Sequence, residues 1–392
     1  MLTRLKLLTA GESHGSALTG ILDGVPAGVP LTKQEFALQL KRRRHGHGRS
    51  PRQQLEVDDV VVAGGVRYGK TTGAPVAVRI DNHEAARWAN TLSPWPVDEP
   101  AAKNTVPRPG HADRAGMLKL GHDDVRDVLE RASARETAMR VALSVVCRSI
   151  LQECGVVVGS HVVQIGSARS DRPIVDVAAD SLRADSSPVR CLDADGEARM
   201  VALIDDAAKR GETLGGAFVV VVRGLPIGLG SFTQWDRRLN ARLGAALLSI
   251  HSVKSVGFGD GAALAATPGT QAHDAFVVDA VQDGRSGTRR PRRSSNHAGG
   301  LEGGMSNGED VVVEVVCKAL STVPGGLPSV DTATGLAARG LVERSDVCAV
   351  PSASIVGEAM ACVLLCDALL EKFGGDSLEQ LRAHITASGH YA

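Results

Sequence analysis

The chain has 392 residues, and its 44 basic residues balance 44 acidic ones, so the formal net charge at neutral pH is zero. A chain without net charge lacks the long-range field that draws proteins onto nucleic acid or an anionic membrane. Seven cysteines form no Cys-x-x-Cys pair, and their odd number argues against a complete disulfide framework, which predicts a cytoplasmic location. Neither the first ten residues nor the apolar run at 360–366 has the length of a signal peptide or a membrane span, which predicts a soluble protein.

Length alone suggests two or three domains, but we find no linker that separates two folding units. We therefore expect a single domain over residues 1–392. Hydrophobic residues make up 43% of the chain and aromatic residues only 3%, so the core must consist mainly of small aliphatic side chains.

Hydrophobic periodicity predicts the elements of the first half. Strands are expected at 2–9, 57–63 and 74–80, and a helix at 31–44 with apolar positions at Phe36, Leu38 and Leu40. The proline-containing stretch 88–107 is expected to be irregular surface. The clearest helix covers 123–154, and we expect it to be bent or interrupted around residues 131–137.

The second half alternates in the same style. Strands are expected at 156–166, 216–222, 275–281 and 311–317, and helices at 200–210, 237–250 and 356–372. This alternation predicts an α/β chain of the α+β type, with layers of sheet and helix and no doubly wound Rossmann sheet. The run 285–293 contains five arginines and is expected to be a solvated loop.

Two histidines lie in glycine-containing turns, Gly11-Glu12-Ser13-His14-Gly15 and Arg108-Pro109-Gly110-His111. Either turn alone is as compatible with an exposed histidine as with a site. Together with Arg108, however, they supply a cation and proton donors, which suit a phosphorylated ligand.

Several other segments carry groups that suit an anionic ligand. Arg42, Arg43, Arg44 and Arg49 surround a loop that contains two histidines, where they either bind phosphate or carboxylate or form a solvated helix end. The two histidines, His45 and His47, make a poor metal-ligand set, and no metal site is expected.

Further along the chain, Arg131 and Arg135 are expected to share one face of a helix. The glycine-rich segment 299–308 has neither a dinucleotide nor a Walker spacing, yet its backbone can cradle an anion. Residues 318–322 add a lysine and two hydroxyls after a valine-rich strand. Arg344 and Asp346 are expected to point to one face of a strand-like segment.

In their order, the segments 11–15, 108–113, 131–137, 299–308 and 344–347 resemble the signature segments of chorismate synthases. The resemblance extends over essentially the whole chain. It implies a β-α-β sandwich subunit, a cytoplasmic homotetramer and a lyase of the shikimate pathway of aromatic amino acid biosynthesis. The implied reaction is an anti-1,4-elimination that converts 5-enolpyruvylshikimate 3-phosphate to chorismate and phosphate, with reduced FMN required but not consumed.

The resemblance also implies roles by position. His14 matches the histidine that protonates reduced flavin, His111 the one near the leaving phosphate, and Asp346 the carboxylate that acts with flavin N5 on the C6 hydrogen. Ser13 and Ser133 match supporting hydroxyls. Arg43, Arg49, Arg108 and Arg135 match the cations around the substrate, and Arg43 and Arg49 also contact NADPH in members that reduce their own flavin. The implied FMN contacts are Arg131, Ala132, Ser133, His251, Ser252, Gly303, Lys318, Ala319, Leu320, Ser321, Thr322 and Arg344.

The chain differs from the residues common in the family at Ala132, Ala319 and the His251-Ser252 pair. Because these positions match FMN contacts, the differences bear on the affinity for FMN. Two alternatives stand beside the lyase. One is an anion or RNA binder that uses the arginines at 42–49 and 285–293, against which neutrality and the few aromatic residues count. The other is a flavin oxidoreductase that consumes NADPH, for which the sequence offers no hydride-donor site.

Overall fold

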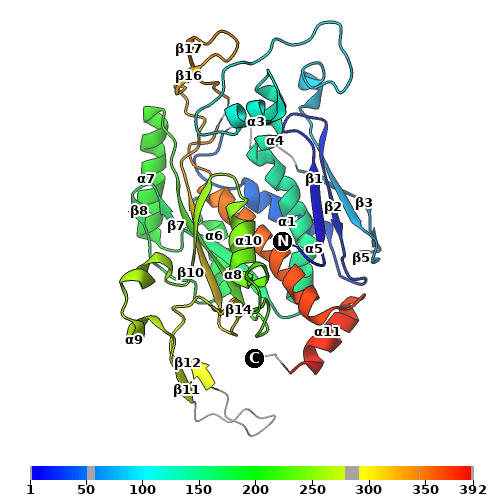
Figure 1. The fold of residues 1–392 in the computed structure, drawn as a ribbon, viewed down its shortest axis with the longest axis vertical. Coiled ribbons are helices and arrows are strands. Elements are labelled where there is room, and N and C mark those ends of the chain that lie inside the picture. Colours follow the sequence, from blue (N-terminus) through cyan, green and yellow to red (C-terminus); the bar gives the residue numbers. More distant parts are fainter. Residues whose placement is uncertain (1, 51–57, 279–290, 344, 390–392) are drawn as a thin grey trace.

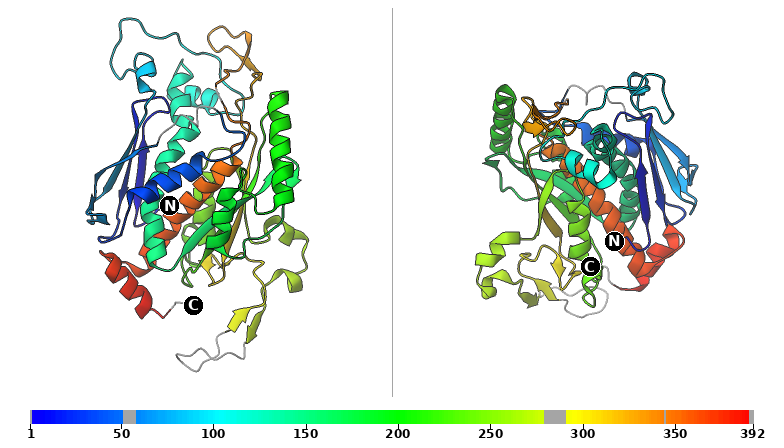
Figure 2. Two further views of the ribbon diagram at one scale, coloured as in Figure 1. Left: turned by 180° about the vertical axis from the view of Figure 1, so that it is seen from behind. Right: turned by 45° about the horizontal axis from the view of Figure 1, so that its top comes forward.

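Two antiparallel sheets enclose a layer of helices in the computed structural model, which describes residues 2–50, 58–278, 291–343 and 345–389 (Figure 1). The same three layers are visible from behind and with the top tilted forward (Figure 2). The expected β-α-β layering is confirmed. Within both large sheets the paired strands of the described residues are antiparallel, so the sheets are not doubly wound.

The smaller sheet has four strands in the order β1-β2-β6-β3. Its residues alternate between the two faces: Leu18 and Leu22 of β2 are buried, whereas Ile21 between them is 41% exposed. Gly20 lets helix α5 (Thr137–Glu153) approach closely, because a Cβ there would lie 2.6 Å from Met139 Cγ. The strands are β1 (Lys6–Ala10), β2 (Ala17–Asp23), β6 (Val76–Asp81) and β3 (Val60–Gly64).

The larger sheet has five strands in the order β10-β15-β9-β7-β8. Its central strands are valine-rich and largely buried, as expected for strands that are covered by other elements. The strands are β10 (Val253–Phe258), β15 (Val311–Cys317), β9 (Gly216–Arg223), β7 (Val157–Ile165) and β8 (Ala168–Arg169).

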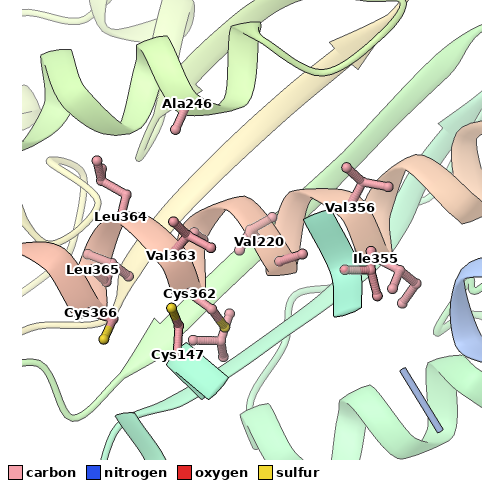
Figure 3. Packing of buried hydrophobic residues seen from close by; sticks show 14 of the residues in the cluster. Cys147, Val220, Ala246, Ile355, Val356, Cys362, Val363, Leu364, Leu365 and Cys366 are labelled. Carbon is pink, nitrogen blue, oxygen red and sulfur yellow. The ribbon is translucent and has the colours of Figure 1, made fainter. Parts of the chain in front are cut away.

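Three helices form the middle layer: α1 (Lys33–Arg44), α5 (Thr137–Glu153) and α10 (Val350–Phe373). Among the described residues, α10 is long and apolar enough to cross a membrane, but 94% of its most apolar stretch is buried inside the protein. Figure 3 shows Leu364 of α10 directed toward Ala246 of α8, and Cys362 beside Cys147 of α5. The helix thus packs between α5 and strands β7 and β9 of the larger sheet, whereas α5 covers β2 and β6 of the smaller sheet.

Shorter elements complete the fold. The helices are η1 (Ala85–Trp88), α3 (Asp113–Leu120), α4 (Arg126–Ala132), η2 (Ala134–Glu136), α6 (Val177–Ser186), α7 (Ala194–Arg210), η3 (Trp235–Arg237), α8 (Leu239–Leu248), η4 (Gly261–Ala266), α9 (Gly269–Ala272) and α11 (Leu378–Ala387). Four hairpins pair β4 (Val66–Arg67) with β5 (Lys70–Thr71), β11 (Phe276–Val278) with β12 (Pro291–Arg293), β13 (Leu301–Glu302) with β14 (Met305–Ser306), and β16 (Pro328–Val330) with β17 (Ala337–Arg339).

Most expected elements are present, with the following differences. Leu38 of α1 is 51% exposed, so its prediction as a core position is wrong, and Arg42 and Arg43 are buried on that helix instead. Helices α3, α6 and α11 were not predicted, and neither were strands β2, β8 and β10 of the two large sheets. The expected strands at 57–63 and 275–281 and the run 285–293 each extend into residues that lie outside the described ranges. The described part of that run, Pro291–Arg293, forms strand β12, so the expectation of a solvated loop is wrong there.

A fully buried carboxylate, Glu358 of α10, joins the helix layer to β7. Arg42 of α1 donates two hydrogen bonds to it, at 2.8 and 2.9 Å, and Arg148 of α5 donates one at 2.6 Å. Ser160 of β7 donates another at 2.7 Å. Burial opposes ionisation, but the arginine charges outweigh it and hold the pKa of Glu358 below its usual value. The alternative of a solvated end for α1 is therefore wrong for Arg42.

We expect Glu358→Gln to lower the free energy of unfolding by about 3–5 kcal/mol, because it leaves buried arginines without their counter-charge. The lowered pKa means that this stabilisation is present at neutral pH and is lost as the pH falls through the acidic range. Urea unfolding of both proteins measures the difference. The matched control is Asp206→Asn, which breaks a surface pair with Arg210 and should change stability by less than about 1 kcal/mol. Equal losses in the two variants would contradict this role of Glu358.

Candidate active site

A cavity of about 480 Å³ lies where seven separate segments of the chain converge. They are the loop after β1, the end of α1 with the loop that follows it, residues 108–112, the α4–α5 junction, the end of α8, residues 318–322, and the segment that leads into α10. The cavity therefore lies at the end of the helix layer formed by the C-terminal end of α1 and the first turns of α10.

Most of the candidate site residues that were predicted from the sequence line this cavity. The selected residues that line it are Ser13, His14, Arg43, Arg49, Arg108, His111, Ala132, Ser133, Arg135, His251, Ser252, Lys318, Leu320, Ser321, Thr322 and Asp346.

Four selected residues are placed differently. Arg131, Ala319 and Gly303 are not among the described residues that line the cavity. Arg131 instead donates to the backbone oxygen of Thr9 at 2.8 Å, and Gly303 lies in the turn between β13 and β14. Arg344 lies outside the described residues.

The long helix predicted at 123–154 is interrupted at Ser133, as expected. Its backbone is extended there (φ −70°, ψ 140°), and its hydroxyl accepts a hydrogen bond from the backbone N–H of Arg135. This break turns Arg135 into the cavity while Arg131 remains on the outer side. The prediction that the two arginines share a helix face is therefore wrong, because the helix does not continue between them.

His14 forms a buried pair with Glu130 of α4. Its Nδ1 lies 2.9 Å from Glu130 Oε1, and its backbone N–H donates to Oε2, also at 2.9 Å. A carboxylate accepts only, so Nδ1 carries the hydrogen in this pair, which leaves Nε2 as the ring nitrogen not engaged by Glu130. Burial opposes ionisation of Glu130, but hydrogen bonds from His14 and Arg126 outweigh it and lower its pKa.

His111 forms a second pair of the same kind with Asp113. Its Nδ1 lies 2.5 Å from Asp113 Oδ1, while Arg108 donates to the other carboxylate oxygen through Nε at 2.8 Å. Burial disfavours the charged Asp113, but His111 and Arg108 outweigh it and hold the pKa of this carboxyl well below its usual value. Arg108 also donates to Thr322 at 3.1 Å, which ties this pair to the segment 318–322.

Asp58 holds two of the cavity arginines. Its carboxylate is fully buried and accepts from Arg135 at 2.5 Å and from Arg43 at 3.3 Å. Burial would raise the pKa of Asp58, but the charges of Arg43 and Arg135 outweigh it and lower the pKa. Asp58 thus fixes guanidinium groups from α1 and from the α4–α5 junction side by side.

Asp346 forms a short ion pair with Arg49. Arg49 Nη1 donates to its Oδ2 at 2.5 Å, and the backbone N–H of Ser50 donates to Oδ1 at 2.7 Å. Residues 345–349 contain no strand, so the expected strand-like segment is wrong. An irregular path followed by the start of α10 places Asp346 in the cavity instead.

His251 and Lys318 complete the wall on the side of β10 and β15. Burial lowers the pKa of His251, and burial together with the charge of Lys254 lowers the pKa of Lys318. His251 Nδ1 is buried without a hydrogen-bond partner among the described residues, although Glu136 Oε1 lies 3.7 Å away. A buried polar atom of this kind normally has a partner, so a ligand in the cavity is its natural complement.

The arrangement suits a ligand with several negative charges. Arginines and a lysine line the cavity, and His14 and His111 bring groups that can transfer protons. The carboxylates of Glu130, Asp113 and Asp58, which hold these histidines and arginines, are not among the lining residues that the structure describes. Preorganised cations at a buried site stabilise charge that develops on a leaving group.

Comparison with known proteins agrees with this chemistry. The sequence profile of the chorismate synthase family matches residues 5–370. The chorismate synthase of Streptomyces coelicolor is 50% identical over 392 residues, which cover 98% of both chains. That of Nocardia farcinica is 50% identical over 98% of this chain and 95% of the relative.

The chain belongs to the chorismate synthase family. A solved structure titled "Crystal Structure of Chorismate Synthase" superimposes with a TM-score of 0.78 at 35% identity, over 99% of this chain and 98% of that one. The family resemblance and the layered fold expected from the sequence are therefore both confirmed.

Sequence reasoning missed the carboxylates that support this family site. Glu130 and Asp58 belong to no recognised motif, and Asp113 was quoted in a segment without a role. Glu343 and Ser50 also line the cavity and were not selected. A sequence signal exists for Glu130 alone, which follows Arg126 at the i,i+4 spacing of a helical ion pair.

We expect Asp113→Asn to lower the chorismate-forming turnover by about 10- to 100-fold, because His111 loses the carboxylate that orients its ring and Arg108 loses its counter-charge. Steady-state rates at several pH values measure the effect. Asp127→Asn is the matched control, since Asp127 pairs with His122 at 3.5 Å on the surface, and this variant should retain full turnover. Full turnover in Asp113→Asn would remove the pair from the mechanism.

Proposed function

We propose that this chain converts 5-enolpyruvylshikimate 3-phosphate to chorismate and phosphate by anti-1,4-elimination, with reduced FMN required but not consumed. The observation that carries the proposal is the convergence, in one cavity of a chorismate synthase chain, of two histidine–carboxylate pairs, four arginines and Asp346. The substrate carries two carboxylates and a phosphate, and several guanidinium groups are needed to offset their desolvation.

The residues present fit a flavin mononucleotide. His251 Nδ1 is an unpartnered buried polar atom in the cavity wall, and Lys318, Ser321 and Thr322 supply a cation and two hydroxyls for a phosphate. The proposed FMN contacts within the cavity are Ala132, Ser133, His251, Ser252, Lys318, Leu320, Ser321 and Thr322; Arg131, Gly303, Ala319 and Arg344 are proposed from the family resemblance alone. When bound, the reduced flavin supplies electron density transiently and recovers it.

The chain's own groups hold and move the protons. His111 lies beside Arg108, and its Nε2 donates a proton to the departing phosphate while the guanidinium stabilises the growing charge. Asp346 takes up the proton that leaves C6, after the substrate draws Arg49 toward its own anionic groups. With Nδ1–H held by Glu130, His14 would supply a proton to the reduced flavin through Nε2 when the ring carries both hydrogens, and the hydroxyls of Ser13 and Ser133 lie 3.1 Å apart beside it.

The remaining arginines orient the substrate. Arg43 and Arg135 are held next to one another by Asp58 and are the proposed contacts for substrate carboxylates. Where NADPH reduces the flavin, Arg43 and Arg49 are the proposed contacts for its phosphates. The RNA-binding alternative is disfavoured, because Arg42 and Arg43 are buried and Arg49 faces Asp346.

A cytoplasmic homotetramer with each chain folded as one domain is also part of the proposal. The outward face of the four-stranded sheet carries exposed Leu8 and Ile21, which are paired in register, together with Val61. An apolar sheet face of this kind supports association of subunits. All seven cysteines are free and buried, which supports a reducing compartment, and the hydrophobic core extends from Leu5 to Ile385.

We expect anaerobic phosphate release from the enolpyruvyl substrate to require photoreduced FMN and to yield one chorismate per phosphate over many turnovers of the same flavin. Oxidised FMN should support no turnover, because it cannot donate electron density. Phosphate and chorismate are assayed in parallel with NADPH absorbance. Equal rates with oxidised FMN, or consumption of one NADPH per product, would favour the oxidoreductase alternative and contradict the proposal.

For Asp346→Asn we expect a single-turnover rate at least about 100-fold lower, with the substrate dissociation constant changed by less than about threefold, because shape is retained and the base is lost. Rapid-mixing kinetics and equilibrium binding measure the two quantities. Asp205→Asn, which alters an exposed carboxylate paired with His47, is the control and should match the wild type. An unchanged single-turnover rate in Asp346→Asn would leave Asp346 as a structural partner of Arg49.

A further inference from the structure

Trp88 lies against the imidazole of His14, although it comes from a surface segment to which the family resemblance assigns no role. The two ring centroids are 4.3 Å apart with an interplanar angle of 34°. The indole also lies 5.0 Å from the guanidinium carbon of Arg126. Trp88 is the last residue of η1, at the start of the irregular stretch 88–107.

The segment is tied to the histidine loop itself. Asn82 accepts a backbone hydrogen bond from Glu84 through its side chain and donates through Nδ2 to the backbone oxygen of Gly15 at 2.9 Å. The backbone N–H of Asn82 donates to the oxygen of Ser16 at 3.0 Å. The tryptophan is thereby fixed in register with the residues that follow His14, rather than packed there by a loosely held loop.

Trp88 and Glu130 restrain His14 in different ways. The carboxylate of Glu130 fixes the position and the hydrogen of Nδ1, but a hydrogen bond alone allows the ring to tilt about that contact. The indole lies against this ring at an interplanar angle of 34°, and its bulk restricts the tilt of the imidazole. Glu130 and Arg126 of α4 are charged groups beside this contact, with Glu343 beyond Arg126 at 3.1 Å.

We infer that Trp88 is a positioning residue for the proposed elimination, whose indole holds the His14 ring in the plane that aims Nε2 at the ligand. The expected effect on catalysis rests on the proposed function, whereas the contact between Trp88 and His14 is independent of it. Trp88 is not among the described residues that line the cavity, so it acts through His14 and not on the substrate.

Kinetics test the consequence. We expect Trp88→Leu to lower kcat by about 10- to 100-fold with KM changed by less than about twofold, because a misaimed proton donor costs rate and not binding. Trp88→Phe retains a flat ring and should recover at least about half of kcat. Trp95→Leu, in the same segment with a 75% exposed side chain, is the matched control and should retain full kcat. Full activity in Trp88→Leu, or a Trp88→Phe variant as impaired as the leucine variant, overturns the inference.

Fluorescence tests the contact without any turnover. The full-length Trp95→Phe/Trp235→Phe variant keeps Trp88 as its single tryptophan, because the chain has three. In the flavin-free protein, adding His14→Asn should shift the emission to the red and raise acrylamide quenching by at least about twofold, since the amide no longer covers the indole. Identical emission and quenching with and without His14→Asn overturns the inference. A wild-type protein without chorismate-forming activity would instead contradict the proposed function and leave the fluorescence result intact.

Discussion

Burial of arginine side chains is the constraint on which the structure depends. A guanidinium group taken out of water is destabilising unless a carboxylate offsets its charge, and removing one partner of such a pair leaves an uncompensated buried charge. The chain meets this requirement with a few fully buried carboxylates, each shared by more than one arginine. Glu358 joins α1, α5 and β7, and Asp58 joins α1 to the α4–α5 junction. The C-terminal end of α1, which Glu358 and Asp58 both hold, thereby presents Arg43 to the cavity.

The orientations of His14 and His111 depend on the same sharing of a buried carboxylate with an arginine. Each is held at Nδ1 by a buried carboxylate that also neutralises an arginine: Glu130 serves His14 and Arg126, and Asp113 serves His111 and Arg108. Since the carboxylates fix the tautomer before a ligand arrives, little reorganisation remains for the reaction itself. Asp346 differs, because its partner Arg49 lines the cavity and is itself able to meet an anionic ligand. Asp346 and a cation of the cavity are therefore coupled before a ligand binds.

Much of this architecture could be predicted from the sequence, and the remainder could not for physical reasons. Periodicity located α5 and the valine-rich strands, because their buried faces repeat at the spacing of the element. It placed the start of α10 six residues late, since Ser352 and Ser354 are buried polar residues that interrupt the apolar pattern. Ordered motifs selected most cavity residues. The partner of Arg135, however, lies 77 residues away at Asp58, and a lone aspartate carries no pattern that reveals such a contact.

A crystal structure of the chain with FMN and the phosphorylated substrate bound tests the central claim most directly, namely that buried carboxylates hold the cations and histidines in a binding-ready arrangement. The substrate phosphate is predicted to lie within hydrogen-bond distance of Arg108 or His111 Nε2, with Asp58 still joining Arg43 to Arg135. A phosphate bound outside this cavity, or Asp58 separated from both arginines in the complex, would contradict it.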